Sequence, residues 1–95
     1  MPRRLRSETE IISLILRSTQ YYTGTKLSQI QYETYISYNQ LKEFLTMMIE
    51  NQLITYFKEE KVFKITEYGM HVLELYGEMD KLLDYTRLNN VVKVT

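Results

Sequence analysis

Apolar residues recur at helical spacing in the first half of the chain. The first such segment begins at Ser7, which forms the pattern of a capping box with Glu10, and it continues to about Thr19. Polar residues then end the helix and predict a loop. Thr25 has the chemistry of an N-cap, so we expect a short second helix after it that loses its apolar pattern near Thr34.

A third helix is predicted from about residue 37 to residue 51. Ser37 and Gln40 repeat the capping-box pattern at its start. The helix carries a continuous apolar stripe, which predicts that one side of it faces the core. The stripe consists of Leu41, Phe44, Leu45, Met48 and Ile49.

The period changes after this helix. Residues 53–57 and 62–66 are rich in β-branched and aromatic side chains around the polar turn 58–61, which predicts a β-hairpin. Thr66 is then placed to cap a fourth helix over residues 67–88.

Apolar residues in the fourth helix alternate in steps of four and three, the spacing typical of a coiled-coil seam. We expect a homodimer through this seam, also because a chain of 95 residues buries a small share of its surface on its own. The seam residues are Tyr68, Val72, Leu75, Met79 and Leu82. For residues 89–95 a short strand, a packed tail and a frayed end all remain open.

This order of elements predicts a mainly α, α+β fold in one domain over residues 1–95. Its body, residues 7–66, has the arrangement of a winged helix-turn-helix, and a long C-terminal coiled-coil dimerisation helix follows. In such a body the second helix braces the third, which leaves the outer side of the third helix free to enter a DNA major groove.

The outer side of the predicted third helix therefore holds the candidate base contacts. Asparagine bonds adenine in bidentate fashion, and lysine reaches guanine or a phosphate. The alternative is a polar face that is simply solvated, which Glu43 beside Lys42 favours. The candidates are Ser37, Tyr38, Asn39, Lys42 and Thr46.

Cations elsewhere are candidates for phosphate contacts. A helix N-terminus attracts anions at the start of the second helix, and lysines flank the hairpin turn. Because Glu59 and Glu60 lie between those lysines, a solvated, nearly neutral turn is an equal alternative. The candidates are Lys26, Lys58, Lys61, Arg3, Arg4 and Arg6.

The chain has nine tyrosines, three of which lie near the predicted helix turn. Tyrosine hydroxyls donate hydrogen bonds to phosphates, and we assign this role to Tyr38. The rings of Tyr32 and Tyr35 are instead expected to fill the gap between helices.

Composition excludes several classes of function. The chain has no cysteine and a single histidine, His71, to which we assign no role, so no metal site or cofactor is predicted. No arrangement of a nucleophile with a base, and no phosphate-binding glycine loop, indicates an enzyme or a small-molecule substrate. The apolar stretches are too short to cross a membrane, and we expect a cytoplasmic protein.

Two runs of sequence resemble a known group of proteins. They are "GTKLSQIQYETYISYNQLKEFLTMMIENQLI", residues 24–54, and "VFKITEYGMHVLELY", residues 62–76. They are similar to the Sso10a-like, chromatin-associated family of small winged-helix proteins from archaea and their viruses. The resemblance implies DNA binding through the third helix and wing, and an antiparallel pairing of the last helix with its copy. Family members often have glycine where this chain has Gln52, so we expect a left-handed backbone or a different helix end there.

The formal net charge of the chain is zero, from 12 basic and 12 acidic residues. The chromatin proteins of the family are clearly basic, so a neutral chain favours a sequence-specific double-stranded DNA-binding protein, a dimeric transcriptional regulator, over abundant coating of DNA. A protein–protein interaction module and a chromatin-associated architectural protein are the alternatives. Either a nucleoid-associated location or, for a viral protein, the host cytoplasm is compatible with this hypothesis.

Overall fold

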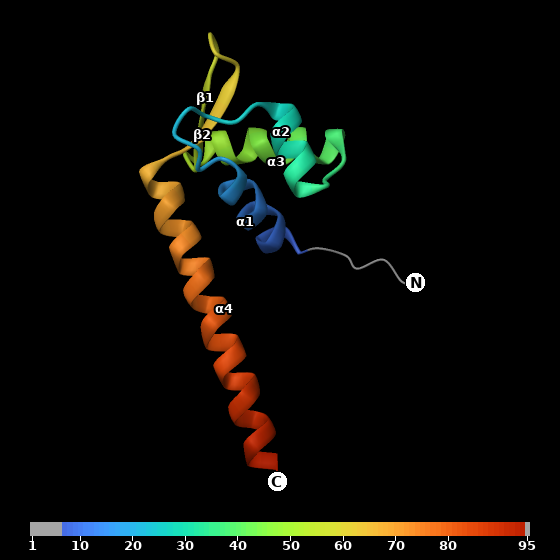
Figure 1. Ribbon diagram of the computed structural model, residues 1–95, viewed down its shortest axis with the longest axis vertical. Coiled ribbons are helices and arrows are strands. Elements are labelled where there is room, and N and C mark those ends of the chain that lie inside the picture. The colour runs from blue at the N-terminus through green and yellow to red at the C-terminus, as the bar shows by residue number, and fades with distance from the viewer. Residues whose placement is uncertain (1–6, 95) are drawn as a thin grey trace.

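The chain folds into a winged body from which one long helix extends (Figure 1). In this computed structural model the backbone of residues 7–94 is described, together with the side chains of residues 7–79, 81 and 82. The predicted α+β order of four helices and one antiparallel hairpin is confirmed. The elements are α1 (Glu8–Ser18), α2 (Leu27–Thr34), α3 (Tyr38–Glu50), β1 (Ile54–Phe57), β2 (Val62–Ile65) and α4 (Glu67–Val94).

The predicted capping box at the start of α1 is confirmed. The amide of Glu10 donates to the Ser7 hydroxyl at 3.1 Å, and the amide of Ser7 donates to the Glu10 carboxylate at 3.3 Å. Two of the four amides that an isolated helix start leaves unpaired are thereby satisfied.

The prediction that Thr25 caps α2 is wrong. Thr25 is buried, and its backbone exchanges hydrogen bonds of 2.9 and 2.8 Å with Phe63 of β2. Its hydroxyl donates to the carbonyl of Ser18 at 2.7 Å, so that it ties the end of α1 to the hairpin. The N-cap of α2 is Lys26, whose side chain has no group that accepts a hydrogen bond from an amide.

Helix α3 buries Leu41, Leu45 and Met48 as its stripe predicted, and Phe44 is partly buried. Ile49 is the exception, because 38% of its surface is exposed. Ile49 follows Met48 by one residue, which turns it about 100° around the helix axis and away from the core. It borders a shallow groove together with Tyr56 and Tyr68.

Helix α3 ends in a Schellman motif with Gln52 in the position that favours glycine. Gln52 has φ 62°, so of the two outcomes expected here, a left-handed backbone or a different helix end, the left-handed backbone occurs. The amide of Gln52 donates to the carbonyl of Ile49 at 3.0 Å, and the amide of Leu53 donates to the carbonyl of Met48 at 2.8 Å.

The hairpin pairs Ile54 with Ile65 and Phe57 with Val62 in antiparallel register. Successive strand residues point to opposite faces of a sheet, and the face that includes Ile54, Phe63 and Ile65 packs on the core. Because Thr25 pairs with the free edge of β2, a short third segment of backbone extends the sheet.

Thr66 caps α4 as predicted and joins it to the body. Its hydroxyl oxygen accepts from the amide of Gly69 at 2.9 Å and lies 2.6 Å from the carbonyl oxygen of Gln52, to which it donates. Val72 and Leu73, in the next turn, pack against the core.

The backbone of α4 is helical through Val94. The sequence pattern did not decide between a strand, a packed tail and a frayed end for residues 89–95. The structure shows that residues 89–94 continue the helix. Within residues 7–94, no helix combines the length and the hydropathy that a membrane span requires.

Candidate nucleic-acid interface

The outer side of α3 is open to solvent. Asn39, Lys42 and Thr46 are all exposed, whereas the opposite side of the helix is buried in the core. Residues three and four apart lie on one face of a helix, so these three side chains form a single row. Glu43 is exposed beside them. The fold thus leaves uncovered the face that the sequence indicated.

Tyr38 and Lys42 are in contact at the leading end of this row. The ammonium of Lys42 lies 5.3 Å from the centre of the Tyr38 ring, a cation–π distance. Tyr38 is itself 48% exposed, so its hydroxyl is accessible. This contact holds the ammonium toward the start of α3.

Ser37 is the N-cap of α3. Its hydroxyl oxygen accepts from the amide of Gln40 at 3.3 Å. The residue is exposed, and its hydroxyl proton remains free to donate to an anion.

Tyr32 and Tyr35 do not fill a gap between helices, and that prediction is wrong. They are 71% and 80% exposed, and their rings lie 6.4 Å apart on the surface. Tyr35 has φ 57° at the C-cap of α2, which turns the chain sharply and leaves its side chain in solvent. Tyrosine on such a surface can contact another macromolecule.

The start of α2 is a polar hollow. Because Lys26 supplies no side-chain cap, the first amides of the helix are left for another acceptor, and a helix N-terminus favours anions. Hydroxyls and amides surround this point. The hollow is lined by Tyr21, Thr23, Gly24, Thr25, Lys26, Ser28 and Gln29.

Tyr21 at the rim of this hollow is tied to α2. Its hydroxyl donates to the carboxylate of Glu33 at 3.1 Å, and Gln29 donates to the same carboxylate oxygen at 2.6 Å. The hydrogen bond to Glu33, with the negative charge of that group, raises the pKa of Tyr21 above its ordinary value.

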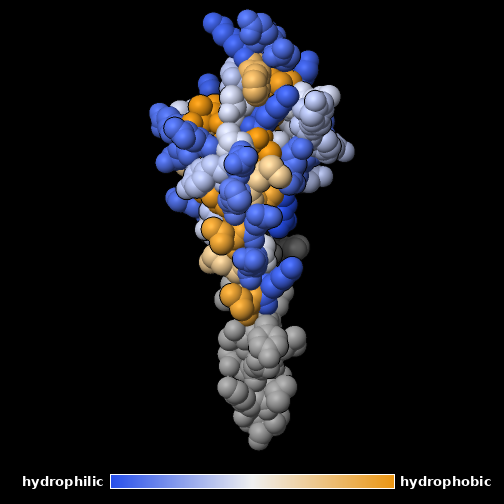
Figure 2. Space-filling view, turned by 90° about the vertical axis from the view of Figure 1, so that its left-hand side faces the viewer, coloured by the Kyte–Doolittle hydropathy of each residue, from blue (hydrophilic) through white to orange (hydrophobic). Residues whose placement is uncertain are grey.

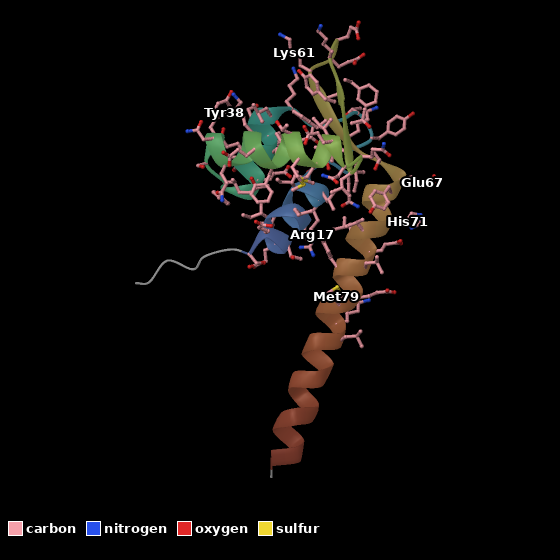
Figure 3. The ribbon with its side chains drawn as sticks, turned by 180° about the vertical axis from the view of Figure 1, so that it is seen from behind. Arg17, Tyr38, Lys61, Glu67, His71 and Met79 are labelled. Atoms are coloured by element: carbon pink, nitrogen blue, oxygen red, sulfur yellow. The ribbon has the colours of Figure 1, made fainter. Side chains whose placement is uncertain are left out.

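The hairpin tip carries exposed Lys58 and Lys61, with exposed Glu59 and Glu60 between them. Lys61 has φ 56°, and its amide donates to the carbonyl of Phe57 at 2.7 Å, which closes the turn. Figure 3 shows Lys61 at the hairpin tip and Tyr38 at one end of α3, both away from the far end of α4. The tip is an exposed turn of near-zero net charge.

A further cation near the hairpin was not predicted. The ammonium of Lys64 lies 5.1 Å from the ring centre of Phe57 and 5.7 Å from that of Tyr22. Strand alternation places Lys64 and Phe57 on one face of the hairpin, and that signal was present in the sequence. The contribution of Tyr22 depends on the pairing of Thr25 with β2, which no local pattern reveals.

The predicted arginine arm, which consists of Arg3, Arg4 and Arg6, lies outside the described residues.

The predicted seam of α4 divides into two parts. Val72 packs against the core of its own chain, whereas Tyr68, Leu75, Met79 and Leu82 are exposed by 57%, 57%, 54% and 64%. Figure 2 shows apolar side chains along the described part of α4.

His71 is exposed, and its Nδ1 lies 3.7 Å from the Glu74 carboxylate. Among the side chains that the structure describes, no cluster of three potential metal ligands occurs.

Comparisons with known proteins agree with this geometry. A family model described as winged helix-turn-helix matches residues 5–84. Among solved structures, the crystal structure of Sso10a-2, a DNA-binding protein from Sulfolobus solfataricus, has a similar fold with a TM-score of 0.67. The two chains are 21% identical, and the match covers 95% of this chain and 97% of the other. No curated protein matches. The resemblance seen in the sequence is therefore confirmed at the level of the fold, and the chain belongs to the winged helix-turn-helix family.

Proposed function

We propose that this protein binds double-stranded DNA in a sequence-specific manner and acts as a dimeric transcriptional regulator. One observation carries the proposal: Asn39, Lys42 and Thr46 form an exposed row on the outer side of α3, while its other side is fixed in the core. A helix supported in this way fits the major groove, where such side chains distinguish base pairs. The similarity of the fold to that of Sso10a-2, a DNA-binding protein, supports the proposal.

Phosphate contacts would surround the row. Lys26 and the uncapped amides of α2 present donors at one side, and Lys58 and Lys61 present two more cations at the hairpin tip. Arg3, Arg4 and Arg6, which precede α1 in the sequence, would add three positive charges. These contacts position a protein on DNA but do not read its sequence.

The charges favour specific over nonspecific binding. Glu43 lies beside the row, Glu59 and Glu60 lie at the hairpin tip, and each repels phosphates. Because nonspecific affinity depends on net phosphate neutralisation, a chain of zero net charge binds random DNA weakly at physiological salt. Base contacts must then supply the affinity, as in a regulator and not in an architectural coating protein.

A dimer would form through α4. Leu75, Met79 and Leu82 are exposed with the spacing of a coiled-coil seam, and a second copy of the helix would cover them. The two α3 helices of such a dimer would read two half-sites whose separation is set by α4.

Selection of bound fragments from random duplex DNA tests the function, because a specific protein enriches one motif. Asn39→Ala and Lys42→Ala should each weaken binding to that motif by about 5- to 150-fold, corresponding to about 1–3 kcal/mol per base contact. Arg17→Ala is the matched control, because Arg17 is an exposed cation on α1 (Figure 3). No enrichment, with no duplex binding at low salt, would exclude the proposal.

Light scattering tests the dimer. The wild-type protein should have twice the mass of the chain at micromolar concentration. Leu75→Lys should give the monomer mass and leave the melting of the winged body nearly unchanged, because Leu75 is 57% exposed in one chain. A monomeric wild-type protein would contradict this part alone.

A protein-interaction module is the second candidate. The exposed rings of Tyr32 and Tyr35, 71% and 80% accessible, favour it because tyrosine is enriched at interfaces between proteins. Two results together would establish this function in place of the first. The chain would bind a stoichiometric protein partner that Tyr32→Ala releases, and it would not bind duplex DNA.

A further inference from the structure

The hairpin has a partly exposed face on the side of the sheet away from the core. We call it the wing outer face and define it by Tyr22, Phe57 and Lys64. Phe57 and Lys64 share this face by strand alternation, whereas Ile54 and Phe63 point to the core. The α3 residues Leu41, Leu45 and Met48 belong to the core on the other side of the sheet.

The backbone before α2 brings Tyr22 to this face. Thr25 pairs with β2, and Gly24 lies so close to the strand that a Cβ added to it would be 2.5 Å from Val62 and 3.4 Å from the Lys64 side chain. Gly24 also has φ 88°, which favours glycine. The close approach places the Tyr22 ring 5.7 Å from the Lys64 ammonium.

The two rings are accessible, in contrast to aromatic residues of a core. Tyr22 is 94% exposed and Phe57 is 40% exposed. The Lys64 ammonium lies between them and forms no salt bridge with any side chain that the structure describes. An accessible ring next to a cation that forms no salt bridge combines a stacking surface with an anion site.

The charge of this face comes from Lys64. Residues 20–25, 54–57 and 62–65, which form the face and its edge, contain no other charged side chain. This local balance contrasts with the neutral chain and with the hairpin tip, where Glu59 and Glu60 offset the lysines. A polyanion is therefore favoured here over a basic protein surface, which would need carboxylate partners on this chain.

We propose that the wing outer face binds an unpaired strand of nucleic acid. A base would stack on Tyr22, a second base would stack on Phe57, and a phosphate would contact the Lys64 ammonium. Bases in a duplex are already stacked on their neighbours, so a flat ring of this kind selects unpaired nucleotides. This site is separate from the row on α3, and the inference does not depend on the proposed duplex binding.

Fluorescence anisotropy with a labelled oligothymidylate of about 12 nucleotides tests the proposal, since site sizes of single-strand binders are about 4–16 nucleotides. The full chain should bind this probe at low salt. Tyr22→Ala should weaken binding by about 5- to 150-fold, the equivalent of about 1–3 kcal/mol per stacked base. Lys64→Gln should reduce the slope of log affinity against log salt by about 0.7, one phosphate contact on a single strand.

Tyr32→Ala is the matched control, because it removes a tyrosine that is 71% exposed on α2 and whose ring, among the described side chains, has no lysine over it. It should bind the probe like the wild-type chain. Tyr22→Ala should also keep its affinity for a random duplex, and its melting temperature should show that it folds.

Three results would overturn the inference. The first is a wild-type chain that fails to bind oligothymidylate, as expected if the face serves a protein partner. The second is an equal affinity of Tyr22→Ala and Tyr32→Ala for this probe. The third is loss of single-strand binding in Asn39→Ala and Lys42→Ala but not in Tyr22→Ala. Binding of oligothymidylate without binding of duplex DNA would contradict the proposed function and leave this inference standing.

Discussion

The ammonium of Lys42 lies 5.3 Å from the ring centre of Tyr38, one helical turn before it on the exposed side of α3. The contact orders a side chain that otherwise has many rotamers, and it lies at the end of the row proposed to enter DNA. A positioned lysine loses less conformational entropy on binding than a free one.

Tyr38→Leu should therefore weaken binding to the selected duplex, because it removes both the ring under Lys42 and a hydroxyl donor. The cation–π contribution at an exposed site is about 0.5–1 kcal/mol, or roughly two- to fivefold in affinity. Tyr38→Phe retains the ring and should lose only the effect of the hydroxyl. The check is to measure the duplex affinity of both variants in the Lys42→Met background, where the difference between Tyr38→Leu and Tyr38→Phe should vanish. A difference of unchanged size would exclude coupling between Tyr38 and Lys42.

Gln52→Gly should stabilise the protein. Gln52 holds φ 62° in the Schellman motif that ends α3, and a left-handed backbone costs a residue with a side chain about 1–2 kcal/mol relative to glycine. Glycine is more flexible in the unfolded state, which offsets part of this gain. We expect a net increase of about 1 kcal/mol, or about 4–8 °C in the melting temperature.

Asn51→Gly is the control for this prediction. Asn51 has φ −93°, so glycine removes no strain, and the side-chain bond from Asn51 to the carbonyl of Met47 at 2.8 Å is lost. That variant should melt at a lower temperature than the wild-type chain. Equal shifts in both variants would show that backbone strain at Gln52 is not the cause.

Local signals in the sequence predicted most of the backbone. The capping residues Ser7, Ser37 and Thr66 have their partners within three residues, so each helix start was readable from its own segment. The stripe of α3 likewise predicted the face that is buried, and with it the face left exposed at Asn39 and Lys42.

Contacts between distant segments were the ones that sequence patterns missed. Threonine favours the cap of a helix, which predicts that role for Thr25, but pairing with Phe63 buries it in the sheet instead. Tyr22 reaches Lys64 only through that pairing. Tyrosine also occurs both in cores and on surfaces, so its hydropathy does not predict where it lies. The exposure of Tyr35 follows from the left-handed turn of the backbone at that residue.

Tyr21 should titrate above the ordinary value of a tyrosine, because its hydrogen bond to Glu33 and the charge of that carboxylate raise its pKa. A pKa raised by folding contributes stability below the unfolded value of about 10, and this stability is lost as the pH rises through the folded pKa. Tyrosinate absorbance near alkaline pH measures the effect. Glu33→Gln should return the late-titrating tyrosine toward 10, and Tyr21→Phe should remove it; a titration curve unchanged by Glu33→Gln would contradict the assignment.

The two glycines of α4 should respond to alanine in opposite directions. A Cβ on Gly69 would lie 2.2 Å from the carbonyl oxygen of Leu53, whereas a Cβ on Gly77 would meet nothing within 4 Å of its own chain. Gly69→Ala must therefore push the first turn of α4 off the end of α3, at a cost of about 1–3 kcal/mol. Gly77→Ala should stabilise the helix by up to about 1 kcal/mol, because alanine is the better helix former.

Chemical denaturation of both variants at one protein concentration measures this contrast. Gly77→Ala should increase stability only if nothing packs on Gly77. A partner helix packed closely over Gly77 would make the same substitution destabilising. Gly77→Ala that destabilises a dimer but not a Leu75→Lys monomer would place the second copy against this residue. Gly69→Ala should be destabilising in both states, since Leu53 belongs to the same chain; equal stability of Gly69→Ala and wild type would refute the close contact.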